Sequence, residues 1–168
     1  KIFGKEGFKL IFDYAFELTS VLRGLVEMHC NFEAMNQPEL FIFNYRFVPK
    51  YVQEQLNKLM SRIQNEDFKD DRNQFIKMEY LNRVEKINLL LNDLNTELHK
   101  AIREEDDSFV SRTMIDAPQY FYQDCVVLRA ITINPLTTPL ILKEIIEQQN
   151  KLGLKIYKNY FQSRFEKI

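Results

Sequence analysis

A seam of apolar residues in the middle of the sequence limits the possible folds more than any other feature. The seam advances in alternating steps of four and three residues and consists of Tyr80, Val84, Ile87, Leu91, Leu94, Leu98 and Ala101. This spacing places all of them on one side of an α-helix, as in the core-facing side of a bundle helix. The other side of the same helix carries Asn and Glu residues. The spacing therefore predicts one long helix from about Arg72 to about Arg103.

Apolar residues with helical spacing predict further helices before and after this seam. Their boundaries follow from capping boxes, such as Asn36 with Glu39, and from breaks at Pro49 and at Asn134-Pro135. The predicted helices cover residues 8–34, 36–47, 50–64, 116–133 and 138 to nearly the end of the chain. We recognise no strand-like alternation.

These segments predict an all-α fold, an irregular up-down helical bundle of four long helical segments that proline breaks divide into five or six helices. With 168 residues, of which 45% are hydrophobic, the chain is expected to form one domain over residues 1–168. Because the sequence opens with Lys1, we expect that domain to be excised from a longer chain. No apolar run is long enough for a transmembrane helix.

Catalytic and metal-binding residue types are scarce and scattered. The chain has two histidines, His29 and His99, and two cysteines, Cys30 and Cys125, with none of the spacings of a zinc site. Whether the two cysteines pair is left open. No glycine-rich phosphate loop and no nucleophile motif is found. We therefore predict no catalytic residues, no metal and no cofactor, and few cysteines with no glycosylation sequon favour a cytoplasmic location.

Charge and aromatic residues suggest where a partner could bind. The net charge is -1, so the fragment is not expected to bind nucleic acid. An aromatic cluster follows Pro118, and the segment 151–168 holds five basic residues against one acidic residue. Aromatic and basic side chains are common at recognition surfaces. The candidate residues for binding a partner or ligand are Tyr120, Phe121, Tyr122, Arg129, Lys155 and Lys158.

The absence of a catalytic set favours a non-enzymatic regulatory or interaction domain that binds another macromolecule through a helix face, either a protein partner or a second copy. The alternative is a domain that senses a small, apolar ligand in a pocket inside the bundle, as part of a regulator or receptor. An enzyme with dispersed acid and base groups stays open as a third interpretation.

Overall fold

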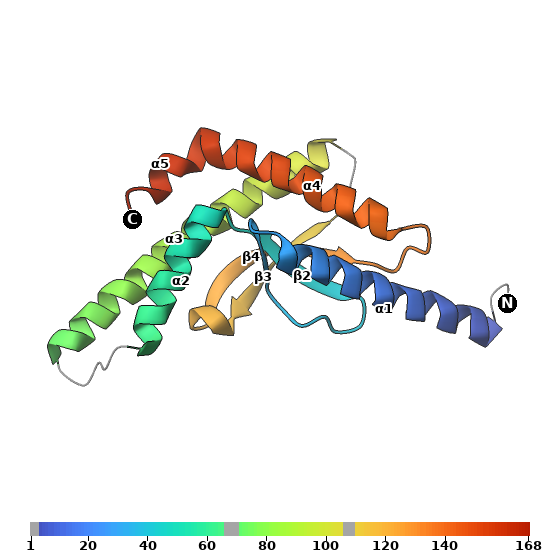
Figure 1. Ribbon diagram of the computed structural model, residues 1–168, viewed down its shortest axis with the longest axis horizontal. Helices are drawn as coiled ribbons and strands as arrows, with labels where there is room; N and C mark the ends of the chain where they lie inside the picture. Colours follow the sequence, from blue (N-terminus) through green and yellow to red (C-terminus); the bar gives the residue numbers. More distant parts are fainter. Residues whose placement is uncertain (1–3, 66–70, 106–109) are drawn as a thin grey trace.

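The computed structural model describes residues 4–65, 71–105 and 110–168, and within these it omits the side chains of residue 65 and residues 71–73. Helices and a sheet are interleaved along the chain (Figure 1). In order, the elements are α1 (Gly4–Met28), β1 (Phe32–Ala34), β2 (Ile42–Phe47), α2 (Lys50–Asn65), α3 (Asp71–Glu105), β3 (Ser111–Ala117), the 3-10 turn η1 (Pro118–Tyr120), β4 (Gln123–Ile131), α4 (Pro139–Ile156), the π-helix η2 (Tyr157–Phe161) and α5 (Gln162–Phe165).

The all-α prediction is wrong, because the four strands form one antiparallel sheet in the order β1-β2-β4-β3. The segment predicted as a helix over 36–47 contains β2, and the one predicted over 116–133 contains the end of β3, η1 and β4. The first predicted helix also extends too far, since α1 ends at Met28 and residues 32–34 form β1. An up-down bundle is therefore replaced by helices packed on a sheet.

The strands were not predicted because their sequence patterns are ambiguous between a strand and a buried helix. In β2, Phe43, Tyr45 and Phe47 alternate with Asn44 and Arg46, the two-residue period of a strand. All five are buried, so apolar and polar positions do not separate into inside and outside. In β4 a continuous β-branched and apolar run fits a central strand as well as it fits a buried helix. Asn36 and Asp116 are residue types that cap helices, and they led us to predict helices in place of the two strands.

The other predicted helices are confirmed. The helix α3 spans the apolar seam, whose residues Val84, Leu91 and Leu98 are fully buried. The helix α4 starts after Thr138, whose Oγ1 accepts a hydrogen bond from the N–H of Ile141 at 3.3 Å. It continues through η2 into α5 nearly to the end of the chain. None of the described helices is apolar over a stretch long enough to cross a bilayer.

Helices α1 and α4 pack on the sheet face that carries Tyr45 and Phe47. The Tyr45 hydroxyl donates to Oε1 of Gln149 in α4 at 2.9 Å, and the Phe47 ring lies against Gly153 in α4. At the end of β4, Thr132 shares a hydrogen bond with Thr19 of α1 at 2.5 Å. Helix α4 crosses over the sheet beside α1 and α3 (Figure 1). One continuous apolar core therefore joins the three helices to this face.

Asparagines of α3 bond to the strands where β2 and β4 diverge. The pairing of β2 with β4 stops at Tyr45 and Leu128. Beyond it, Asn95 accepts from the Phe47 N–H at 2.8 Å and donates to the Phe47 carbonyl at 2.9 Å. One turn away, Asn92 accepts from the Val126 N–H and donates to the Asp124 carbonyl, both at 2.8 Å. The sequence had suggested that this side of α3 faces solvent. Its asparagine side chains instead supply the hydrogen bonds that the strand backbones lack where β2 and β4 separate.

Candidate functional site

The second face of the sheet carries a row of polar side chains that we call the polar face. Residues directly opposite each other in antiparallel strands share a face. Arg46 lies opposite Glu33, Asn44 opposite Arg129, and Arg129 opposite Ser111. Thr113 follows two residues after Ser111 on β3. The polar face is therefore defined by Glu33, Asn44, Arg46, Ser111, Thr113 and Arg129.

Arg46 is the buried centre of the polar face. Its side chain is completely buried, and its Nε lies 2.8 Å from Oε2 of Glu33. Its Nη1 donates to Oδ1 of Asn88 at 3.0 Å and approaches Sγ of Cys125 at 3.4 Å. The Tyr120 ring lies 4.7 Å from the guanidinium carbon, and its hydroxyl donates to Oε1 of Glu33 at 2.7 Å. These contacts offset the cost of burying the charge.

Arg46, Tyr120 and Cys125 each keep one protonation state around neutral pH. Burial would lower the pKa of Arg46, but Glu33 and other neighbours outweigh it and the net shift is upward. Burial raises the pKa of Tyr120, although Arg46 opposes this shift. Burial also raises the pKa of the Cys125 thiol. The cluster therefore holds a charged arginine beside a neutral phenol and a neutral thiol, which suits a structural role better than proton transfer.

Arg129, a predicted recognition residue, lies on the polar face in the middle of the sheet. Its side chain is half-buried, and its Nε lies 3.4 Å from Oδ1 of Asn44. No carboxylate within the described chain pairs with it. Among the described residues its two terminal nitrogens have no hydrogen-bond partner, so they have the capacity to bind an anion. A guanidinium presents paired donors that match a carboxylate.

The three predicted aromatic residues fall into two groups. Tyr120 is buried in the Arg46 cluster, so it is part of the interior and not of a surface. Phe121 and Tyr122 form the tip of the β3–β4 hairpin and are 47% and 73% exposed. The structure thus brings Tyr120 and Arg129 to the same sheet face and leaves Phe121 and Tyr122 at its edge.

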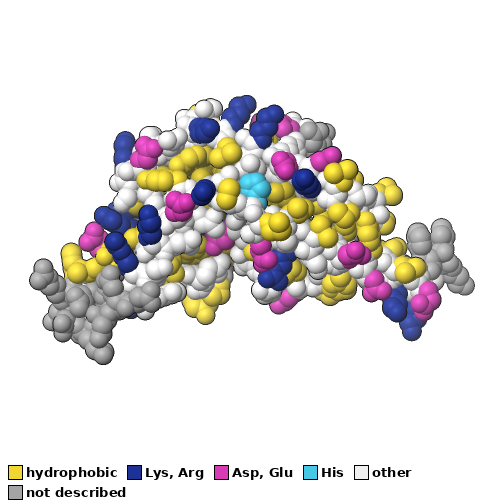
Figure 2. Space-filling model, viewed as in Figure 1, with side chains coloured by type: hydrophobic (Ala, Val, Ile, Leu, Met, Phe, Trp, Pro, Cys, Tyr) yellow, Lys and Arg dark blue, Asp and Glu magenta, His cyan; other side chains and the backbone are white. Residues whose placement is uncertain are grey.

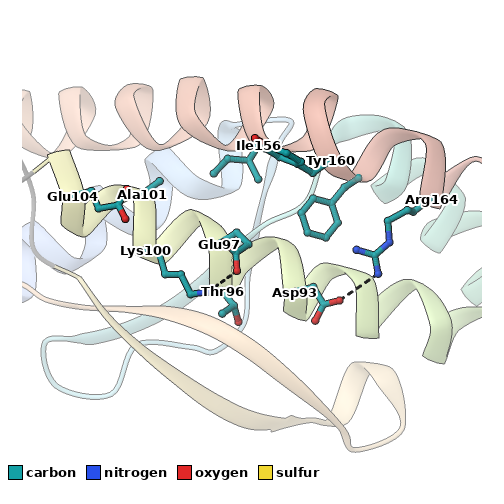
Figure 3. A pocket seen from close by; sticks show the side chains of 10 residues that line it. Asp93, Thr96, Glu97, Lys100, Ala101, Glu104, Ile156, Tyr160 and Arg164 are labelled. Atoms are coloured by element: carbon teal, nitrogen blue, oxygen red, sulfur yellow. Dashed lines mark hydrogen bonds and ion pairs between the residues drawn. The ribbon is translucent and has the colours of Figure 1, made fainter.

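The two predicted lysines lie in a different part of the molecule. Lys155 lines a hollow of about 230 Å³ between α3 and α4, next to a groove of about 510 Å³ shown in Figure 3. Lys158 is exposed on η2. Ion pairs already join opposite charges along the groove, from Arg164 to Asp93 at 3.4 Å and from Lys100 to Glu97 at 2.6 Å. The groove is therefore a weaker candidate for a charged ligand than the polar face.

Sequence reasoning missed Glu33, Arg46 and Asn88, because it placed them on helices or on a solvent-facing side. The available signal was Arg46 itself, a charge placed between phenylalanines and tyrosines in a two-residue alternation. Among the described residues, no group of three His, Cys, Asp or Glu side chains could hold a metal ion. Cys30 is exposed, Cys125 is buried, and both are free thiols.

Hydrophobic side chains also remain exposed on α1, whose first half extends beyond the sheet (Figure 1). Phe8, Phe12 and Phe16 are 56%, 41% and 43% exposed along one stripe of the helix. The Phe12 ring stacks on that of Phe41 at 5.9 Å between centroids. Figure 2 shows hydrophobic side chains gathered at the same end of the molecule. Contiguous exposed apolar surface is typical of sites that bind another protein, a membrane or a ligand.

Comparisons with known proteins point to decarboxylases. No protein-family model matches the sequence. Aspartate 1-decarboxylase of Aliivibrio fischeri (strain ATCC 700601 / ES114) is 26% identical over 152 residues, which are 90% of this chain and 24% of that protein. The structure resembles mouse CSAD in its apo form, with a TM-score of 0.62 and 17% identity over 89% of this chain and 25% of that one.

Two further solved structures share the fold. One is the glutamate decarboxylase domain of diaminobutyrate-pyruvate transaminase and L-2,4-diaminobutyrate decarboxylase from Vibrio parahaemolyticus, with a TM-score of 0.59 and 14% identity over 90% of this chain and 23% of that one. The other is Oryza sativa TDC with PLP and tryptamine, with a TM-score of 0.57 and 13% identity over 92% and 25%. The chain spans about a quarter of the length of the proteins it matches.

These similarities overturn the predicted function. The fold is one found in decarboxylases, which contradicts both a non-enzymatic regulatory or interaction domain and a small-molecule-sensing domain of a regulator. Both predictions rested on the lack of a catalytic set within 168 residues. That argument fails when the similar proteins have about four times the length of the aligned segment.

Proposed function

We propose that this chain forms one domain of an amino-acid decarboxylase and that its polar face is turned toward the rest of that enzyme. The observation that carries the proposal is the agreement of sequence and fold along nine-tenths of the chain with proteins named as decarboxylases. In this proposal residues 1–168 are a single domain, and its partner is the remaining part of the enzyme. The proposed location is the cytoplasm.

The described residues do not form a site for pyridoxal phosphate by themselves. Oryza sativa TDC binds PLP, a cofactor that enzymes hold through a lysine Schiff base with an acidic or basic partner at the ring nitrogen. All lysines among the described residues are exposed or half-exposed, mostly on helices. A Schiff-base lysine needs an enclosed pocket. We therefore derive no chemical step through PLP from this chain.

Arg129 is the residue that we propose to bind the substrate. Every amino acid carries a carboxylate, and aspartate carries two. A half-buried arginine without a carboxylate partner can bind such a group through two parallel hydrogen bonds. Asn44 orients the guanidinium from the neighbouring strand. The remaining enzyme would close over this face and exclude water from the pair.

A direct assay tests the proposal. The full-length protein that contains this chain, supplied with PLP, is incubated with L-aspartate, L-glutamate, L-2,4-diaminobutyrate and L-tryptophan, and released carbon dioxide is measured. We expect turnover of at least one of these acids, with the matching amine as the product. Absence of carbon dioxide release from all four, in a protein that remains folded, would contradict the proposal.

A further inference from the structure

The tip of the β3–β4 hairpin has unusual turn chemistry. After η1, Phe121 and Tyr122 both have positive φ angles, of 57° and 60°. Consecutive residues in this left-handed region are normally Asn and Gly, because a side chain collides there with the backbone. The left-handed conformation is therefore unfavourable for any residue that has a Cβ atom. Two large aromatic residues therefore occupy positions at which a turn of this kind normally has Asn and Gly.

The two aromatic rings make no contacts within the described chain that would compensate for this backbone strain. Both side chains are exposed, and neither makes a hydrogen bond, ion pair or ring contact with another described residue. The backbone, in contrast, is well held, because the Phe121 N–H donates to Pro118 and the Tyr122 N–H to Ala117. Backbone strain of this kind concentrates at functional sites, where it presents a side chain to another surface.

The tip is fixed in its direction as well as in its shape. Tyr120, the residue just before it, is only 6% exposed and lies between Arg46 and Glu33 of the polar face. Pro118 begins η1 and fixes its own φ. The backbone that carries the two exposed rings is thus anchored by a buried neighbour at the edge of the polar face.

We propose that Phe121 and Tyr122, carried on a well-held turn, form an aromatic plug that docks into an apolar recess on the remaining part of the same decarboxylase. The recess would also offer a hydrogen-bond acceptor for the Tyr122 hydroxyl. Aromatic residues often carry much of the binding energy of an interface, and a backbone that is already ordered loses less entropy on docking. The inference rests on the proposed function, which assigns the polar face to the rest of that enzyme.

Covalent labelling of tyrosines in the full-length protein tests the docking without reference to activity. In this chain Tyr122 is 73% exposed and Tyr160 is 69% exposed, so the two would label alike without a covering surface. We expect Tyr122 to label at least about fivefold more slowly than Tyr160. Equal labelling would overturn the proposal. Protection that disappears on dilution would assign the recess to a second copy and would also overturn it.

The labelling result separates this inference from the proposed function. A protein that releases no carbon dioxide but protects Tyr122 would refute the decarboxylase activity and would still support docking of the hairpin tip on the rest of the protein. An active decarboxylase in which Tyr122 is labelled as fast as Tyr160 would support the proposed function and refute the docking of the hairpin tip.

A double substitution tests the energetic side of the inference. Phe121→Asn with Tyr122→Gly supplies the residues that this turn prefers and removes both rings. Without docking, relief of the strain should raise the melting temperature of the full-length protein. We expect a fall of several degrees instead, because the lost docking outweighs the relieved strain, while Tyr160→Ala changes the melting temperature little. A rise or no change in the double variant would overturn the proposal.

Discussion

At the residue scale, the polar face combines a buried arginine that has several partners with a half-buried arginine whose side chain has one in the part of the chain that the structure describes. Arg46 is enclosed by Glu33, Asn88 and Tyr120, although its Nη2 atom has no partner in the described structure. The side chain of Arg129, two strands from Glu33, has the Asn44 amide as its one partner among the described residues. The two arginines thus differ in role: Arg46 joins β1, β2 and α3, and Arg129 is the residue that we propose to bind the substrate.

Removal of the Glu33 charge should destabilise the domain strongly. Glu33→Gln leaves the Arg46 charge buried without its counterion. We expect the free energy of unfolding, measured in urea, to fall by about 3–5 kcal/mol. The matched control is Glu27→Gln, which breaks the exposed pair with Arg23 at 2.7 Å. That variant should lose about 1 kcal/mol or less. Equal losses in both would show that the Arg46 cluster contributes no more than a surface ion pair.

Predictability from sequence differs sharply between residues. The aromatic cluster and Arg129 could be picked out from residue type alone, and their proposed roles await the tests above. Tyr120 could not be separated from Phe121 and Tyr122, because burial depends on a hairpin that the helical interpretation did not include. Glu33 and Arg46 are thirteen positions apart and meet only through strand register. Such long-range pairs leave no mark in local periodicity.

At the element scale, prediction succeeded where one face is apolar and the other polar. The helices α2, α3 and α4 follow their 3.6-residue patterns, since each buries one stripe. The strands β2 and β4 are buried on both faces, so their patterns are ambiguous. The asparagines of α3 show the same limit, because Asn88 and Asn95 are buried partners of strands and not a solvated face.

Two glycines in helices should respond to alanine with opposite signs. Gly24 in α1 has open space around it, so Gly24→Ala should stabilise the domain by about 0.5–1 kcal/mol through helix propensity. A Cβ at Gly153 in α4 would lie 2.8 Å from the buried Phe47 ring. Gly153→Ala should therefore lower stability by about 1–2 kcal/mol. Thermal unfolding of the two variants measures both effects, and stabilisation by Gly153→Ala would contradict the packing of α4 on β2.

At the scale of the whole molecule, the sheet divides two kinds of surface. One face joins α1 and α4 in the apolar core, while the other carries the polar face, which is buried at Arg46 and Asn44 and half-buried at Arg129, with the exposed hairpin tip at its edge. The exposed stripe on α1 adds apolar surface at one end of the molecule (Figure 2). Sequence periodicity could not have predicted this division, because it depends on a sheet built from segments about eighty residues apart.

The measurement that tests the central claim most directly is the steady-state kinetics of Arg129→Gln in the full-length protein with its best amino-acid substrate. Loss of a charge-assisted pair with the substrate carboxylate should reduce kcat/KM by about tenfold to a hundredfold. The kcat/KM of Arg129→Lys should lie between that of Arg129→Gln and that of the unmodified protein, because lysine keeps the charge and loses the paired geometry. Arg112→Gln, at an exposed position of β3, serves as the control and should match the unmodified protein. An unchanged kcat/KM in Arg129→Gln would contradict the account.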